Sequence, residues 1–157
     1  MSFDQLLAKF DSIVRNYPVK RSALIPILLT TQEHLGYLSD ESITGIAHYL
    51  ELPAIEVFEV VTFYSMLRRQ PVGKHHIQVC TNISCLLLGG EEIYEHVSKR
   101  LGIKEGETTG DGQFSLTEVE CLGACCNAPA MQVNYTYHDD LTLEKVDQVL
   151  HTLKKQP

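Results

Sequence analysis

Residues 70–80, QPVGKHHIQVC, separate two parts of the chain whose apolar residues repeat with different periods. Upstream, the apolar residues over residues 3–17 recur at steps of three and four, which is typical of one face of a helix. Downstream, Ile77 and Val79 alternate with polar neighbours, which is typical of a β-strand that ends at Cys80. The change of period predicts a helical part followed by a part that contains a sheet.

Helix-breaking and helix-capping residues divide the upstream part. Pro18 ends the first helix, Gly36 ends the second, Ser39 caps the third and Pro53 opens the fourth. We expect these helices over about residues 3–17, 21–35, 40–50 and 53–69. The fourth is apolar nearly all round, as expected of a helix that is central in a bundle or covered by another protein. An N-terminal helical bundle is therefore predicted over residues 1–72.

The downstream part is predicted to contain both strands and helices. Strands are expected over HHIQVC, FSLTEVEC and AMQVNY, and helices over GGEEIYEHVSKRLG and LTLEKVDQVLHTLKK. The order strand, helix, strand, strand, helix predicts a compact α/β layer with a small mixed sheet over residues 73–157. The predicted fold class is therefore α+β, with one domain over residues 1–72 and a second over residues 73–157.

Composition and charge narrow the classes of function that we expect for the chain. The chain has 157 residues, of which 44% are apolar and 21% charged, as in a folded globular protein. Its net charge of -7 argues against nucleic-acid binding, which needs a basic face, and favours a basic or mixed-charge protein partner. The N-terminus lacks the features of a signal peptide, and the longest apolar run, ALIPILL, is too short to span a bilayer. We expect a cytoplasmic protein with no direct membrane insertion.

The five cysteines fall in a pattern typical of metal ligands. Without an export signal a disulfide framework is not expected, and metal binding or redox chemistry becomes the leading explanation. Four residues separate Cys80 from Cys85, and three separate Cys121 from Cys125. Each pair begins where a predicted strand ends, so the two loops meet at one edge if both strands run in the same direction. Four thiolates suit zinc or an iron–sulfur cluster.

The surroundings of the two pairs favour a cluster over zinc. Structural zinc prefers the C-x2-C spacing, which neither pair has, and the neighbouring residues TNIS, LLLGG and LGA are small or apolar. A thioredoxin-type redox dithiol is disfavoured as well, because it needs the C-x-x-C spacing, which the chain lacks. A Rieske centre needs two histidine ligands, and we expect His75 and His76 to be solvent-facing or edge residues ahead of the strand.

Three segments together resemble one family. CTNISC at residues 80–85, ECLGACCNAP at residues 120–129 and MQVN at residues 131–134 are similar to the thioredoxin-like [2Fe-2S] subunit of NADH–quinone oxidoreductase (complex I), known as the E or 24-kilodalton subunit. In the first half, HLGYLS and VFEVVTFYSML resemble that family's helical segment. The resemblance extends from about Phe10 to Leu153.

The resemblance implies a thioredoxin-like second domain and a set of ligands. Cys80, Cys85, Cys121 and Cys125 would hold one [2Fe-2S] cluster, which would exchange single electrons with a partner subunit. FMN and NAD would bind that flavin- and NADH-binding partner, since this chain has no G-x-G-x-x-G fingerprint. The chain would then be an electron-transport subunit of an oxidoreductase, without catalytic residues of its own. It would belong to a heteromer that is peripheral to the inner membrane.

Several alternatives stay open. The same kind of subunit occurs in NAD-linked formate dehydrogenases and hydrogenases, and a structural zinc-binding interaction protein would use the same four cysteines. A stand-alone ferredoxin is disfavoured by the helical extension. Cys126 has no ligand position in the family pattern, so it is either a packing residue or a rescue ligand for Cys125. Pro129 lies where thioredoxin-like folds often carry a cis proline.

Overall fold

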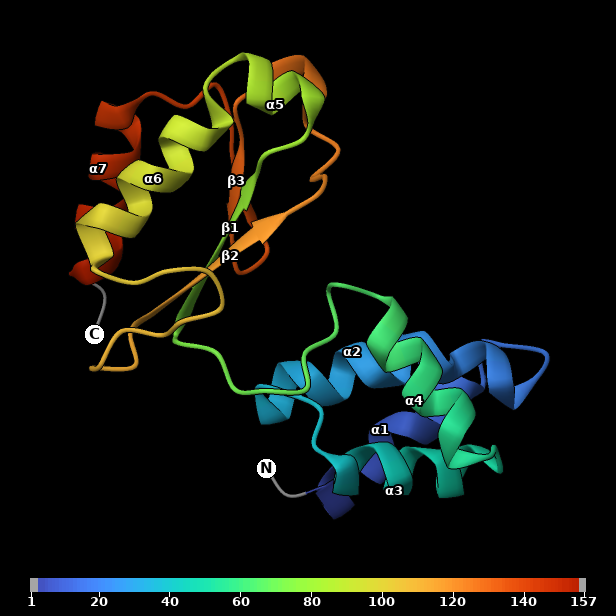
Figure 1. Cartoon of the computed structure of the whole chain (residues 1–157). Coiled ribbons are helices and arrows are strands. Elements are labelled where there is room, and N and C mark those ends of the chain that lie inside the picture. Colours follow the sequence, from blue (N-terminus) through green and yellow to red (C-terminus); the bar gives the residue numbers. More distant parts are fainter. Residues whose placement is uncertain (1–2, 156–157) are drawn as a thin grey trace. The chain divides into compact units, whose positions relative to one another are not determined.

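The computed structural model describes residues 3–155, which fall into two compact units divided between Pro71 and Val72 (Figure 1). The first unit is helical. Its elements are α1 (Phe3–Val14), the 3-10 turn η1 (Lys20–Ala23), α2 (Leu24–Leu35), α3 (Asp40–Leu50) and α4 (Ala54–Phe63). The described part of this unit contains no strand.

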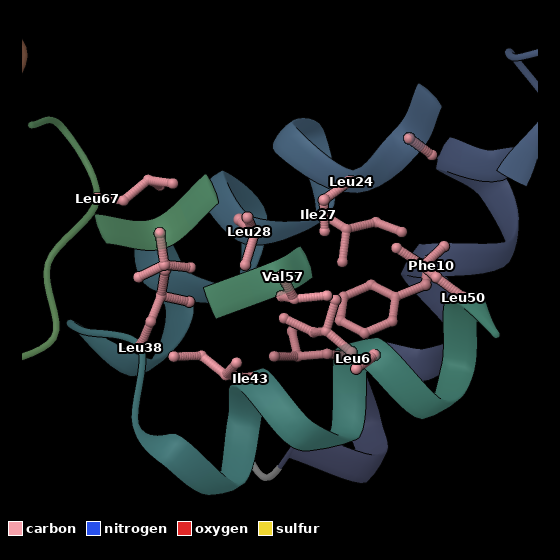
Figure 2. Packing of buried hydrophobic residues seen from close by; sticks show 14 residues of the cluster. Leu6, Phe10, Leu24, Ile27, Leu28, Leu38, Ile43, Leu50, Val57 and Leu67 are labelled. Carbon is pink, nitrogen blue, oxygen red and sulfur yellow. The ribbon is translucent and has the colours of Figure 1, made fainter. Parts of the chain in front are cut away.

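One apolar core holds the helical unit together. Phe10 of α1, Ile27 of α2, Ile46 of α3 and Val57 of α4 are all fully buried, and Figure 2 shows the Phe10, Ile27 and Val57 side chains converging between the helices. Burying an apolar side chain of this size contributes about 1.5–3 kcal/mol. The three- and four-residue repeat of the sequence therefore places the apolar face of each helix in a shared core.

The predicted helix ends at Gly36, Ser39 and Pro53 are confirmed, but three helices are shorter than predicted. The first ends at Val14 rather than at Pro18, and α2 begins only at Leu24, after η1. The Ser39 hydroxyl accepts a hydrogen bond from the Ser42 amide at 3.2 Å, and α2 ends at Gly36, which has a positive φ of 87°. The fourth helix was predicted over residues 53–69, yet α4 ends at Phe63. Tyr64 takes an extended conformation, and the residues after it turn back toward α2.

The second unit is built on a mixed sheet. Its strands are β1 (His75–Cys80), β2 (Phe114–Val119), β3 (Met131–Val133) and β4 (Thr136–His138), in the spatial order β2-β1-β3-β4. β1 is parallel to β2 and antiparallel to β3, and β3 is antiparallel to β4. The remaining elements are α5 (Ile83–Leu87), α6 (Gly90–Leu101), the 3-10 turn η2 (Cys125–Asn127) and α7 (Leu143–Lys154). The predicted α+β class with a small mixed sheet is confirmed.

The helices α6 and α7 lie on the same side of this sheet (Figure 1). Ile77 of β1 and Leu116 of β2 are fully buried and share a core with Val97 of α6 and Val146 of α7. One face of the sheet therefore packs against helices, which fixes the strand ends that carry the cysteines.

Two further features of the second unit concern the sequence predictions. His75 and His76, expected at solvent-facing or edge positions, are instead 4% and 5% exposed within β1, so that expectation is wrong. His76 Nε2 lies 2.8 Å from the Thr117 hydroxyl of β2, and this polar partner makes its burial tolerable. The Ala128–Pro129 peptide bond is cis.

Over residues 3–155, the chain forms no helix both long and apolar enough to cross a bilayer.

Candidate metal centre

Two parallel strands bring the cysteine-bearing loops to one edge of the sheet. Cys80, the last residue of β1, lies opposite Val119, the last residue of β2. Cys85 follows in α5, while Cys121 and Cys125 follow β2. The sequence predicted a shared edge on the condition that both strands run in the same direction, and the parallel pairing meets that condition.

The first cysteine pair is buried in an apolar pocket of side chains. Cys80 and Cys85 are 4% and 3% exposed and pack with the fully buried Ala130. Burial raises the pKa of the Cys85 thiol, and its hydrogen bond with the Cys80 thiol raises that pKa further. The nearby Cys125 thiol acts in the same direction. Deprotonating Cys85 therefore needs a compensating positive charge, which a bound metal ion would supply.

The second cysteine pair is exposed and lies on a loop shaped by a glycine. Cys121, Cys125 and the adjacent Cys126 are all exposed free thiols. The Gly123 amide donates a hydrogen bond to Cys121 Sγ at 3.3 Å, and Gly123 has a positive φ of 73°. The turn at Gly123 therefore places a backbone amide donor directly at the Cys121 sulfur.

A close backbone approach joins the first pair to α6. A Cβ atom at Gly90 would come within 2.8 Å of the Cys80 carbonyl oxygen and within 2.9 Å of the Cys85 carbonyl oxygen. Only glycine allows the first turn of α6 to pack this closely against both cysteine backbones. The Asn82 side chain further fixes the loop, because its Oδ1 accepts a hydrogen bond from the Ile83 amide at 2.7 Å.

The donor set fits a soft metal centre, although the side chains do not form a complete ligand shell. Within residues 3–155, no group of three or more His, Cys, Asp or Glu side chains is arranged to hold a metal ion. The four cysteines nevertheless share one edge of the sheet, with sulfur as the donor, apolar residues around the first pair and an amide donor at Cys121. Thiolates repel one another until a metal joins them, so closing such a site is coupled to metal binding. The ligand set Cys80, Cys85, Cys121 and Cys125 stays a prediction.

Sequence reasoning missed the short helix that contains Cys85. The Asn82 cap was a usable signal for α5, since asparagine is a favoured residue at that position. We define the α5 leucine surface as Ile83, Leu86, Leu87 and Leu88, whose exposed fractions are 70%, 43%, 78% and 60%. A contiguous apolar surface of this kind usually marks a contact with another molecule.

The fold and these paired cysteines define a class: a mixed-sheet domain that presents two cysteine loops at one edge for a soft metal centre. The sequence model of the thioredoxin-like [2Fe-2S] ferredoxin family matches residues 10–154. The chain therefore belongs to the thioredoxin-like [2Fe-2S] ferredoxin family, within the group that includes the E-type subunits of NADH-quinone oxidoreductase. The expected thioredoxin-like second domain and the resemblance stated above are both confirmed.

Two relatives and one solved structure illustrate the similarity. The E-type subunit of NADH-quinone oxidoreductase from Rickettsia bellii (strain RML369-C) is 45% identical over 157 residues, covering 98% of this chain and 94% of the relative. A second E-type subunit, from Rhizobium meliloti (strain 1021), is 39% identical over 146 residues, covering 93% and 87%. A NAD+-reducing [NiFe]-hydrogenase in the H2-reduced state shares the fold, with a TM-score of 0.71 and 18% identity, over 83% of this chain and 22% of that chain.

Proposed function

We propose that this chain is an electron-transfer subunit that carries one [2Fe-2S] cluster in the NADH-oxidising module of an NADH-quinone oxidoreductase. The observation that carries the proposal is the parallel pairing of β1 with β2, which directs both cysteine loops to one edge. Relatives that are 39% to 46% identical are named as E-type subunits of that complex, which supports the assignment.

The proposed ligands divide into a rigid half and an accessible half. Cys80 and Cys85 are buried and held by β1, α5 and Gly90, whereas Cys121 and Cys125 lie on the exposed loop after β2. When bound, a [2Fe-2S] cluster supplies one-electron oxidation and reduction. The buried pair would fix the position of the centre, and the exposed pair would leave one side open to a redox partner.

The proposed partner is the flavin- and NADH-binding subunit of the same complex, which would carry FMN and bind NAD. The α5 leucine surface continues directly from Cys85, so a protein that covers these leucines would also come close to the cysteine centre. We propose that residues 73–157 carry the redox centre and that residues 1–72 form a separate helical docking domain. The assembly would place the chain at the cytoplasmic side of the inner membrane, attached only through its partners.

Serine variants of each cysteine test the ligand assignment. Protein purified without oxygen is analysed for iron, sulfide and zinc, with Cys80, Cys85, Cys121 and Cys125 each replaced by serine. Each of these variants should lose most of its iron, because serine oxygen replaces a soft sulfur donor. The matched control Cys126→Ser should keep about two irons and two sulfides per chain. A Cys126→Ser protein that loses its iron, while one of the four others keeps it, would contradict the assignment.

A hydrogenase or formate dehydrogenase subunit is the closest alternative within the same chemistry. The structural similarity to the hydrogenase, at 18% identity, concerns the fold alone. Co-purification of the chain from its native cells distinguishes these contexts, because the flavin subunit that binds it belongs to only one of them. A structural zinc protein is the alternative from another class, and about one zinc per chain without iron would establish it.

A further inference from the structure

A groove of about 670 Å³ lies between the edge strand β4 and helix α7. It is separate from the cysteine centre, because His75, which lines it, is the first residue of β1 and Cys80 is the last. The volume falls within the range of about 300–1,000 Å³ that is usual for small-molecule sites. Nothing in the proposed electron transfer uses this groove.

The lining of the groove combines apolar and polar side chains. Leu141, Val149 and Leu153 contribute apolar surface, and His138 and Lys145 contribute polar groups. Lys145 Nζ already donates a hydrogen bond to the Asp140 carbonyl oxygen at 2.7 Å. Asp139, also in the lining, adds a charge opposite to that of Lys145. The lining therefore offers no uncompensated positive charge to a negatively charged ligand.

His75 is a buried side chain with an unused hydrogen-bonding atom. It is 4% exposed, and its Nε2 atom is buried without a hydrogen-bond partner among the described residues. Its ring lies 5.3 Å from the Phe114 ring, measured between centroids. A buried polar atom without a partner is destabilising, so it needs an explanation. His75 also lines the groove, so a ligand bound there lies against this side chain.

Both histidines of the groove are neutral near pH 7. Burial lowers the pKa of His75, and the charge of Lys74 lowers that pKa further. Burial also lowers the pKa of His138. The groove lining therefore offers uncharged imidazole groups, each with one donor and one acceptor nitrogen, and the tautomer decides which nitrogen donates.

We propose that this groove binds a small uncharged amphipathic molecule. Its apolar body would lie against Val149 and Leu153, and its hydrogen-bonding group, such as a carbonyl, amide or hydroxyl, would meet the ring of His75. Such a ligand would satisfy the unpaired histidine nitrogen and remove the apolar lining from water. The site is independent of the cysteine centre, so its test does not depend on the redox function.

Fluorescence titration of the full-length protein with Nile red tests the proposal, since this dye is uncharged, largely apolar and carries a carbonyl group. Saturable binding at one site is expected. Thr152→Trp places a large ring at an exposed lining position of α7 and should abolish binding without disturbing the core. His75→Phe should weaken binding about tenfold, because one hydrogen bond is lost. The matched control His151→Phe, on the same helix but outside the groove, should bind as the wild type does.

Three results would overturn the proposal. The first is an absence of saturable binding to the wild-type protein. The second is unchanged binding in the Thr152→Trp variant together with loss of binding in Leu87→Gln, which would place the dye on the α5 leucine surface. The third is equal affinity of the wild type and the His75→Phe variant, which would remove the histidine contact on which the ligand class rests.

Discussion

Gly90 and Cys80 are in backbone contact: a Cβ atom at residue 90 would come within 2.8 Å of the Cys80 carbonyl oxygen. The same atom would meet the Cys85 carbonyl oxygen at 2.9 Å. These neighbours are backbone atoms, which cannot swing aside as a flexible side chain can. The start of α6 therefore holds the two buried cysteines in place, and the absence of a side chain at residue 90 makes this possible.

Gly90→Ala should destabilise the second unit and lower its iron content. The added methyl group forces the backbone of α6 away from the cysteine loop, and overpacking of this kind costs about 1–3 kcal/mol. The free energy of unfolding from urea titration and the iron content per chain measure the effect. Gly110→Ala is the matched control, because a Cβ there has open space around it. Equal stability of the two variants would contradict the packing argument.

Cys126 should not rescue the centre when Cys125 is removed. We expect Cys125→Ala and the double variant Cys125→Ala/Cys126→Ala to lose iron to the same extent, because the family pattern has no ligand at the position of Cys126. Iron analysis after anaerobic purification measures this. Retention of iron in the single variant but not in the double variant would show that Cys126 replaces its neighbour as a ligand.

An ion-pair network between α6 and α7 should make the stability of the fold decrease at acid pH. The Asp147 carboxylate accepts hydrogen bonds from Arg100 Nε at 2.7 Å and from His96 Nε2 at 2.9 Å. The hydrogen bond from Arg100, followed by that from His96, holds the pKa of Asp147 well below its usual range. Because the folded pKa is depressed, this stabilisation is present above the unfolded pKa of about 3.9 and is lost as the pH falls toward the folded value.

The comparison of wild type with Asp147→Asn tests this pH dependence. The wild type should have the higher melting temperature from pH 7 down to pH 5, and the difference should shrink below about pH 4. Using the difference between two proteins cancels acid effects on the rest of the chain. A melting-temperature difference that stays constant from pH 7 to pH 3 would contradict the role of this carboxylate.

Gln32 should contribute strongly to the stability of the helical unit. It is 1% exposed, its Nε2 donates to the Met66 carbonyl oxygen at 2.9 Å, and its Oε1 accepts from the Arg68 amide at 2.6 Å. Gln32→Met leaves two backbone groups without these partners and should cost about 2–4 kcal/mol. Urea unfolding measures the loss. The matched control Gln70→Met, at an exposed position, should change the free energy of unfolding by less than about 0.5 kcal/mol. A similar loss of stability in the Gln32→Met and Gln70→Met variants would contradict the importance of the two hydrogen bonds of Gln32.

The α5 leucine surface should be needed for partner binding but not for folding. Leu87 is 78% exposed, so Leu87→Gln should leave the melting temperature unchanged and reduce co-purification of the flavin subunit. Tyr135→Gln, at a 61% exposed position between β3 and β4, is the matched control for an exposed apolar residue in the same unit. Unchanged recovery of the flavin subunit with Leu87→Gln would remove this surface from the proposed interface.

Local patterns predicted most of the elements because their signals lie within a few residues. Ser39 caps α3 by accepting a hydrogen bond from the Ser42 amide, and Gly36 ends α2, so neither prediction required knowledge of the tertiary structure. Local patterns could not predict whether β1 and β2 are parallel, because strand pairing joins residues about 40 positions apart. The shared edge of the two cysteine loops was therefore predicted only on the condition that the strands run in the same direction.

The errors arose where distant contacts override local preference. The predicted fourth helix continued to residue 69, but the chain leaves the helix at Tyr64 so that the Met66 and Arg68 backbone groups can reach Gln32. His76 looked like an exposed residue by type, yet a hydroxyl from β2 provides the hydrogen bond that permits its burial. The periodicity of a single segment contains neither of these partners.

The most direct test of the central claim is electron paramagnetic resonance of the full-length protein, purified without oxygen and reduced with dithionite, together with its metal content. A red-brown protein with about two irons and two sulfides per chain, which becomes paramagnetic on reduction by one electron, is the predicted result. A colourless protein that contains one zinc per chain and gives no signal after reduction would contradict the electron-transfer function.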